Sequence, residues 1–237
     1  MTALVHYTLR ACLPARRLAG LGLLMVAGLL FGLIAAVVPE PATSAFGHVA
    51  EHGLFGLVLP LAGLVVGDAV LGAEVRKGTF HFTWLSPVPR WQIAVGRWVG
   101  GSLVVIAAMA PTFFLAGVIA GTPRGGAAAA AGAALGGAAY VAVLMAVGAT
   151  FRRAAAVSLA LVFLGERLLG GVLTGIAQWS PQWEGSAVFT GWAHGLVPRD
   201  GIPNGWGAVV RLVLITLIGL ALTSWRLGKL ELAGPGD

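Results

Sequence analysis

Long apolar runs, each separated from the next by a polar stretch, are the feature that most constrains this chain. A helix crosses the hydrocarbon core of a bilayer in about 20 residues, and six runs reach that length. We therefore predict an all-α, polytopic membrane protein, with residues 1–237 forming a single transmembrane domain. The six transmembrane helices are expected near residues 18–38, 54–72, 98–120, 127–150, 154–177 and 207–225.

The composition supports this fold class. Of 237 residues, 58% are hydrophobic and 10% are charged, whereas soluble domains carry about 25% charged residues. This amount of polar surface is too small to cover a water-soluble globule. Lipid must therefore be part of the solvent. The single cysteine, Cys12, excludes an intrachain disulfide. We expect the first apolar run to be an uncleaved span, because it is longer than the roughly 7–15 apolar residues of a signal peptide.

The basic residues indicate an orientation. With the N-terminus in the cytoplasm, 11 of the 15 Lys and Arg residues fall on the cytoplasmic side and 3 outside, while Arg167 lies in a span. Positive residues are retained on the cytoplasmic side, so we predict a multi-pass protein of the cell (plasma, or inner) membrane with both termini cytoplasmic. Residues 73–97 then form a cytoplasmic loop and 178–206 an outer loop. The net charge of +6 is explained without a nucleic-acid partner.

Two further segments carry structural expectations. Residues 1–17 predict a short amphipathic cytoplasmic segment, helical as far as Leu13 and broken by Pro14. The run 127–150 consists almost entirely of Ala, Gly, Val and Leu. Small side chains allow close helix packing in lipid, so this helix is expected at the centre of the bundle.

The cytoplasmic loop between the second and third runs is the most informative segment. It begins with charged residues and then places Phe80, Phe82 and Trp84 on the cytoplasmic side. Apolar side chains in that position need a partner, which is either the membrane surface or a groove on another protein. An interfacial loop with no protein partner is the alternative.

This loop resembles that of the permeases of ABC-2 type transporters. The similar residues are Glu74-x-Arg76-Lys77-Gly78-Thr79, then Leu85-Ser86-Pro87-Val88-Pro89-Arg90. The order of the basic start, the six spans and the long outer loop agrees with that family over the whole chain. The resemblance implies that residues 1–17 form an elbow helix and that the loop is a coupling helix. The implied docking residues are Glu74, Arg76, Lys77, Gly78, Thr79, Phe80, Phe82, Trp84, Leu85, Pro87, Pro89 and Arg90.

The same resemblance implies partners and an activity. A cytoplasmic ATP-binding subunit would hold ATP and Mg, and a second permease copy or a related permease would complete the transporter. The expected activity is export of a small apolar or amphipathic compound, such as a drug, antibiotic, peptide or lipid. This chain itself is expected to bind no cofactor and to be no enzyme. Its nearest approach to a phosphate-binding loop, Gly72 to Thr79, has Lys77 and Gly78 in reversed order.

His48, Glu51 and His52 match the H-x-x-E-H pattern of one class of zinc enzyme. On a helix the two histidines would share a face, as zinc ligation requires. Gly47 and Gly53 flank the motif and weaken a helix, and the short loops offer no clear third ligand. We predict ordinary surface residues, with no catalytic residue and no metal site, and keep an intramembrane metalloenzyme as an alternative.

Three ionisable residues fall within the predicted spans: Asp68, Glu166 and Arg167. Charges in a membrane are costly and usually face the bundle interior. Asp68 is expected near the inner interface, and the other two in a contact between helices or along a transport pathway. If Asp68 or Glu166 bound a coupling ion, the chain would be a secondary carrier. A non-transporting assembly or immunity protein of similar shape is a further alternative.

Overall fold

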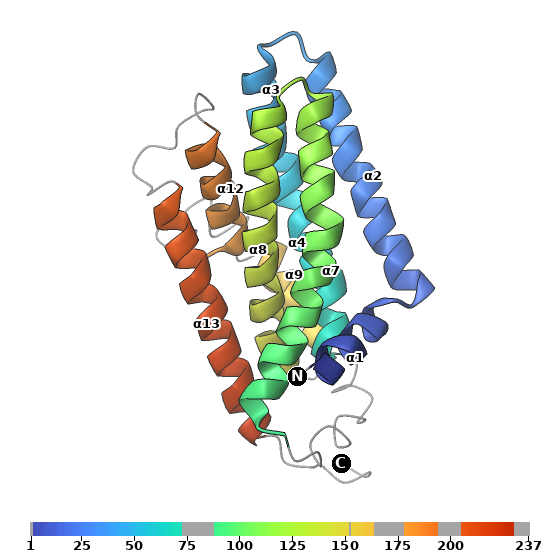
Figure 1. The fold of residues 1–237 in the computed structure, drawn as a ribbon, viewed down its shortest axis with the longest axis vertical. Coiled ribbons are helices and arrows are strands. Elements are labelled where there is room, and N and C mark those ends of the chain that lie inside the picture. The colour runs from blue at the N-terminus through green and yellow to red at the C-terminus, as the bar shows by residue number, and fades with distance from the viewer. Residues whose placement is uncertain (1, 73–87, 152, 164–177, 194–204, 230–237) are drawn as a thin grey trace.

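The computed structural model describes residues 2–72, 88–151, 153–163, 178–193 and 205–229. Within these ranges every regular element is helical (Figure 1), which confirms the predicted all-α class. Five helical segments are long and apolar enough to cross a membrane, as expected of a multi-pass membrane protein. They are Ala15–Val37, Ala42–Leu71, Arg90–Ile119, Pro123–Thr150 and Trp206–Lys229.

The span predicted near 154–177 is described only in its first part. Helix α9 (Ala154–Ala160) continues as an apolar helix to Phe163, and residues 164–177 lie outside the described ranges. The count of six spans therefore stays a prediction. Glu166 and Arg167 also fall outside the described residues.

Two helices meet at a corner near the N-terminus. Helix α1 (Thr2–Cys12) ends before Pro14, and α2 (Ala15–Val37) begins directly after it, as expected from the helix-breaking effect of proline. The guanidinium of Arg17 donates a hydrogen bond from Nη1 to the carbonyl of Ala11 and so closes the corner. That α1 lies in the membrane interface as an elbow helix stays a prediction.

The second long helix begins earlier than the apolar run indicated. Helices α3 (Ala42–Val49), η1 (Ala50–Val58), α4 (Leu59–Gly67) and η2 (Asp68–Gly72) follow one another without a break. The additional turns form because Ala45, Phe46 and Ala50 are buried in the core, which outweighs the unfavourable glycines. The two η segments are π-helical. This geometry is rare in proteins overall, but where it occurs it is often found at functional sites.

Helix α8 (Pro123–Thr150) occupies the centre of the bundle, as predicted. It contacts α4, α7 (Arg90–Ile119), α12 (Pro181–Trp192) and α13 (Trp206–Lys229). Small residues allow these close approaches: a Cβ atom added to Gly117 of α7 would lie 2.3 Å from Cα of Gly126 on α8. The indole of Trp98 on α7 also donates a hydrogen bond of 2.9 Å to the carbonyl of Ala138 on α8.

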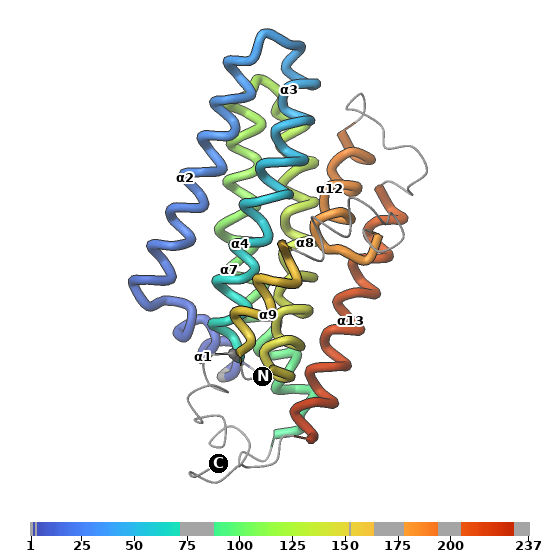
Figure 2. The backbone as a smooth tube through the Cα atoms, turned by 180° about the vertical axis from the view of Figure 1, so that it is seen from behind, coloured from blue at the N-terminus to red at the C-terminus, as the bar shows by residue number. Residues whose placement is uncertain are grey.

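Helix α12 forms in the segment that was expected to be an outer loop. The Ser180 hydroxyl accepts a hydrogen bond from the backbone N–H of Trp183, and Pro181 occupies the first turn, so the helix start is well formed. The backbone of Gly185 lies against α8, since a Cβ atom on Gly132 would be 2.4 Å from its carbonyl oxygen. Figures 1 and 2 show α12 beside α8 and α13. It is therefore part of the packed bundle.

Basic residues gather at one end of the bundle. Figures 1 and 2 place the start of α2, the start of α7 and the end of α13 at the same end, opposite the turn between α7 and α8. Arg16, Arg17, Arg90 and Lys229 belong to these helix ends, whereas Arg124 lies in the first turn of α8 at the opposite end. We call the end that contains Arg16, Arg17, Arg90 and Lys229 the basic end. That the basic end faces the cytoplasm stays a prediction.

Candidate functional site

A large groove lies near the basic end, between α2, α4, α8 and α9. Its volume is about 710 Å³, within the roughly 300–1,000 Å³ typical of small-molecule sites. Leucine side chains from four helices line much of its wall, among them Leu144 of α8. The others are Leu23 and Leu24 of α2, Leu61 and Leu64 of α4, and Leu159 of α9.

The groove exists because α2 leaves the bundle as it approaches the basic end (Figure 1). Farther along α2, contact with α7 is tight: a Cβ atom on Gly32 would lie 2.7 Å from backbone atoms of Ala116. Near its start α2 approaches the bundle less closely: a Cβ atom on Gly20 would lie 3.9 Å from Val65 of α4, an ordinary van der Waals distance. The space that opens between α2 and α4 is the groove.

Charged residues lie at one side of the groove. Arg16 and Arg17 come from the first turn of α2, and Asp68 comes from η2, where the second long helix changes from α to π geometry. The Ser158 hydroxyl of α9 adds a buried polar group. The site therefore combines an apolar wall with two cationic side chains and one carboxylate, which suits a molecule with both a polar and an apolar part.

Next to the groove, an apolar cluster joins the ends of several helices. Leu71 of η2 and Ile93 of α7 pack in it together with Ala149 of α8 and Leu227 of α13, and Val88 packs against them. Leu71 and Val88 flank the segment 73–87. Both ends of the predicted coupling loop are therefore held in one cluster that also touches α8 and α13.

Arg97 reinforces this region from the first part of α7. Its side chain is buried, and Nη1 donates a hydrogen bond of 2.7 Å to the carbonyl of Val70. Its guanidinium also lies 5.6 Å from the ring centre of Tyr7, a distance typical of a cation–π contact. Arg97 falls at the end of the predicted loop 73–97, but in the structure it belongs to α7 and links α7, η2 and α1.

Most predicted docking residues fall outside the described part of the chain. Residues 74–87, which include Glu74, Arg76 and Lys77, are not described. Of the predicted set, the described residues are Pro89, which precedes α7, and Arg90, which begins it. The guanidinium of Arg90 lies beside Gly228 near the end of α13, since a Cβ atom there would be 3.2 Å from Nη1.

The His48, Glu51 and His52 motif lies on the second long helix, where α3 meets η1. Both histidine side chains are exposed, and each Nδ1 lies 3.1 Å from the carbonyl oxygen four residues earlier. No group of three potential metal ligands occurs among the described residues. The two histidines thus lie at the surface, as predicted.

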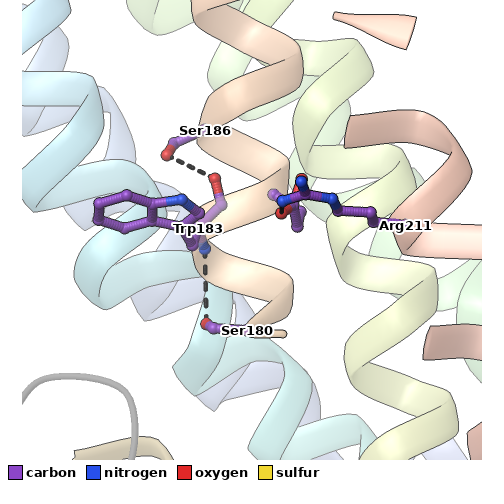
Figure 3. Close-up of polar contacts among 5 residues, drawn as sticks. Ser180, Trp183, Ser186 and Arg211 are labelled. Carbon is purple, nitrogen blue, oxygen red and sulfur yellow. Dashed lines mark hydrogen bonds and ion pairs between the residues drawn. The ribbon is translucent and has the colours of Figure 1, made fainter. Parts of the chain in front are cut away.

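A buried ion pair was not expected from the sequence. Glu184 of α12 is fully buried, and its Oε1 atom lies 2.9 Å from Nη1 of Arg211 on α13 (Figure 3). Burial raises the pKa of the Glu184 carboxyl, while the hydrogen bond and charge of Arg211 act in the opposite direction. Within α12, the Ser186 hydroxyl donates a 2.9 Å hydrogen bond to the carbonyl of Trp183. The pair joins α12 to α13 inside the bundle.

One signal for this helix was present in the sequence. Ser180-Pro181 is a typical helix start, because serine caps the first turn and proline fits its first position. The pairing of Glu184 with Arg211 had no sequence signal, since the two residues are 27 positions apart. The groove itself had none either, because it depends on the angle between helices.

No protein-family model and no curated protein matches this sequence.

Proposed function

We propose that this chain is the membrane-spanning permease subunit of an ATP-driven transporter that moves a small amphipathic compound across the cell membrane. The ATPase is a separate cytoplasmic subunit, because the sequence contains no phosphate-binding loop. In this proposal the basic end is cytoplasmic, a sixth span covers residues 154–177, and two permease copies or two related permeases form the transporter. The direction is export.

The groove at the basic end is the observation that carries the proposal. Its leucine wall and its Arg16, Arg17 and Asp68 side chains suit an amphipathic cargo. Its helices α2, α4 and α9 belong to the first, second and predicted fifth spans. A change in their angles would open or close the groove, which is what alternating access requires.

The apolar cluster at the basic end supports a coupling route. Force applied to the loop 74–90 would reach the bundle through Leu71 at one end and Val88 and Ile93 at the other. Leu71 ends the same helix that carries Asp68 and Leu64 on the groove wall. An ATPase subunit docked on this loop would therefore change the shape of the groove when it closes around ATP, although it does not contact the groove itself.

The proposal is tested by reconstitution. The chain is expressed with an affinity tag in its own host, and a co-purifying P-loop ATPase is identified and reconstituted with it in vesicles. We expect the chain to stimulate hydrolysis of ATP and to support ATP-dependent movement of an amphipathic reporter dye. Arg76→Glu and Gly78→Pro are expected to abolish the stimulation while leaving membrane insertion intact.

Arg124→Glu is the matched control for charge reversal, because Arg124 is exposed at the end of the bundle opposite the loop. It should retain both activities. Transport by the chain alone under a proton gradient would contradict the proposal. So would full ATP-dependent transport in both loop variants.

A secondary carrier is the second candidate, favoured by the position of Asp68 on the groove wall. A carboxylate beside the transported compound could bind a coupling proton. In that case Asp68→Asn would abolish proton-driven uptake into vesicles that contain no ATPase, and ATP would have no effect. Substrate movement only in the presence of the ATPase would exclude this candidate.

A further inference from the structure

The groove has two chemically different parts. Toward the basic end it is lined by Arg16, Arg17 and Asp68. Away from that end its wall is made of leucine side chains, among them Leu24 and Leu64. A ligand that satisfies both parts must carry a charged head and an apolar chain.

The groove is also open toward the surface of the bundle that faces lipid. On its α2 side Leu23 is 71% exposed, and on its α9 side Leu159 is 49% exposed. Both side chains belong to apolar helices and line the groove. A membrane lipid could therefore enter sideways from the bilayer without crossing water.

The charges of the groove favour an anionic head. Two arginines and one aspartate line the groove, and the first turn of α2 adds the partial positive charge of a helix N-terminus. Arg17 is held in place by its hydrogen bond to the Ala11 carbonyl, and Arg16 is exposed beside it. Arginine binds phosphate through charge-assisted hydrogen bonds in a planar geometry.

If Ala15–Val37 spans the membrane, these residues lie at the level of the lipid phosphates. Arg16 and Arg17 occupy the first turn of a span, at the boundary between the apolar helix and the polar corner with α1. Basic pockets between membrane helices are known to bind the head groups of anionic lipids. Charge, depth and lateral opening thus agree on one kind of occupant.

We propose that the groove binds an anionic phospholipid from the leaflet at the basic end. The phosphate contacts Arg16 and Arg17, and an acyl chain lies along Leu24, Leu61 and Leu64. The proposal needs the groove to be embedded in a membrane but does not depend on the ATPase partner, so it can fail or succeed independently of the proposed transport function.

The test measures binding of fluorescent phosphatidylglycerol to the purified chain in mild detergent, with phosphatidylcholine of the same acyl chains as comparison. We expect phosphatidylglycerol to bind more tightly. Arg16→Gln should weaken its binding about tenfold, the usual effect of losing one charge-assisted hydrogen bond, and Arg16→Lys should restore much of it. Arg16 is chosen because the Ala11 hydrogen bond belongs to Arg17, so the corner stays intact.

The acyl-chain part has its own matched pair of variants. Gly20→Leu places a side chain in the groove, which Gly20 lines, and a new Cβ there would be in ordinary van der Waals contact with Val65 at 3.9 Å. Gly22→Leu makes the same change on the same helix, where nothing lies within 4 Å of a new Cβ and the residue does not line the groove. Gly20→Leu should weaken binding of phosphatidylglycerol because its side chain occupies the place of the acyl chain. Gly22→Leu should leave the binding unchanged.

Three outcomes would overturn the proposal. Equal binding of phosphatidylglycerol and phosphatidylcholine would remove the role of the arginines. Equal binding by the two glycine variants would place the acyl chain elsewhere. The third outcome is that inorganic phosphate displaces the fluorescent lipid at the same concentration as unlabelled phosphatidylglycerol does. That result would show an anion site to which the acyl chain contributes nothing.

Discussion

Nη1 of Arg211 on α13 lies 2.9 Å from Oε1 of Glu184 on α12, and the Glu184 side chain is fully buried. Removing the cation would leave a buried carboxylate without its partner, a change that commonly costs about 3–5 kcal/mol. We expect Arg211→Gln to lower the thermal midpoint of the purified protein strongly. Arg124→Gln, at an exposed arginine, is the control and should have little effect. Equal midpoints for wild type and Arg211→Gln would contradict a structural role for the pair.

The same pair should make stability depend on pH. Burial raises the pKa of the Glu184 carboxyl above its ordinary 4.5, against the effect of Arg211. Between pH 4.5 and the folded pKa, the Glu184 carboxyl binds more protons in the folded state than in the unfolded state. Its contribution to stability is therefore fully present below pH 4.5 and is lost as the pH rises through the folded pKa. We expect Glu184→Gln to remove this contribution. The measurement is the thermal midpoint of both proteins between pH 4 and pH 8, and an identical slope in the two would contradict the assignment.

Cys12 offers a direct probe of folding. It is the one cysteine in the sequence and is only 2% exposed. Burial raises the pKa of its thiol, while the charge of Arg17 lowers it, with a net rise. Since the thiolate is the reactive form, we expect slow labelling by a maleimide at neutral pH until the protein is heated through its unfolding transition.

The exposed neighbour of Cys12 provides the control. Leu13 is 56% exposed, so Leu13→Cys in a Cys12→Ser background should be labelled rapidly without heating. Rapid labelling of Cys12 in the folded protein would show that α1 is not packed as described.

The close contact between α2 and α7 predicts a large cost for one small substitution. A Cβ atom on Gly32 would lie 2.7 Å from the backbone of Ala116, which cannot move aside easily. We expect Gly32→Val to destabilise the protein by about 1–3 kcal/mol through overpacking. Gly22→Val, on the same helix with nothing within 4 Å of the new Cβ, should be close to neutral. The measurement is the thermal unfolding midpoint of the two variants. Equal midpoints would contradict the close contact between α2 and α7.

Much of the helical framework could be predicted from hydropathy alone. Five of the six apolar runs correspond to long helices, because a run of about 20 apolar residues in lipid must satisfy its backbone hydrogen bonds internally. Helix starts were less predictable where polar residues lie within a helix. His48 and His52 fall inside the second long helix, since its other face, with Phe46, is buried.

The central position of α8 was predictable because its Ala and Gly residues indicate close packing before any neighbour is known. The identity of those neighbours was not. Nothing local to Gly132 indicates that Gly185 will lie against it, because that contact depends on how α12 enters the bundle. The ion pair of Glu184 with Arg211 was unpredictable for the same reason.

The sequence by itself determined the helical class, the long apolar helices and the uneven placement of basic residues, because these follow from local composition. Only the tertiary structure decided where the helices separate. The groove bounded by Arg16, Asp68 and Leu64 exists because tight glycine contacts hold one part of α2 against α7 and leave its start apart from α4. Helix angles of this kind arise from contacts between distant residues, which no local pattern encodes.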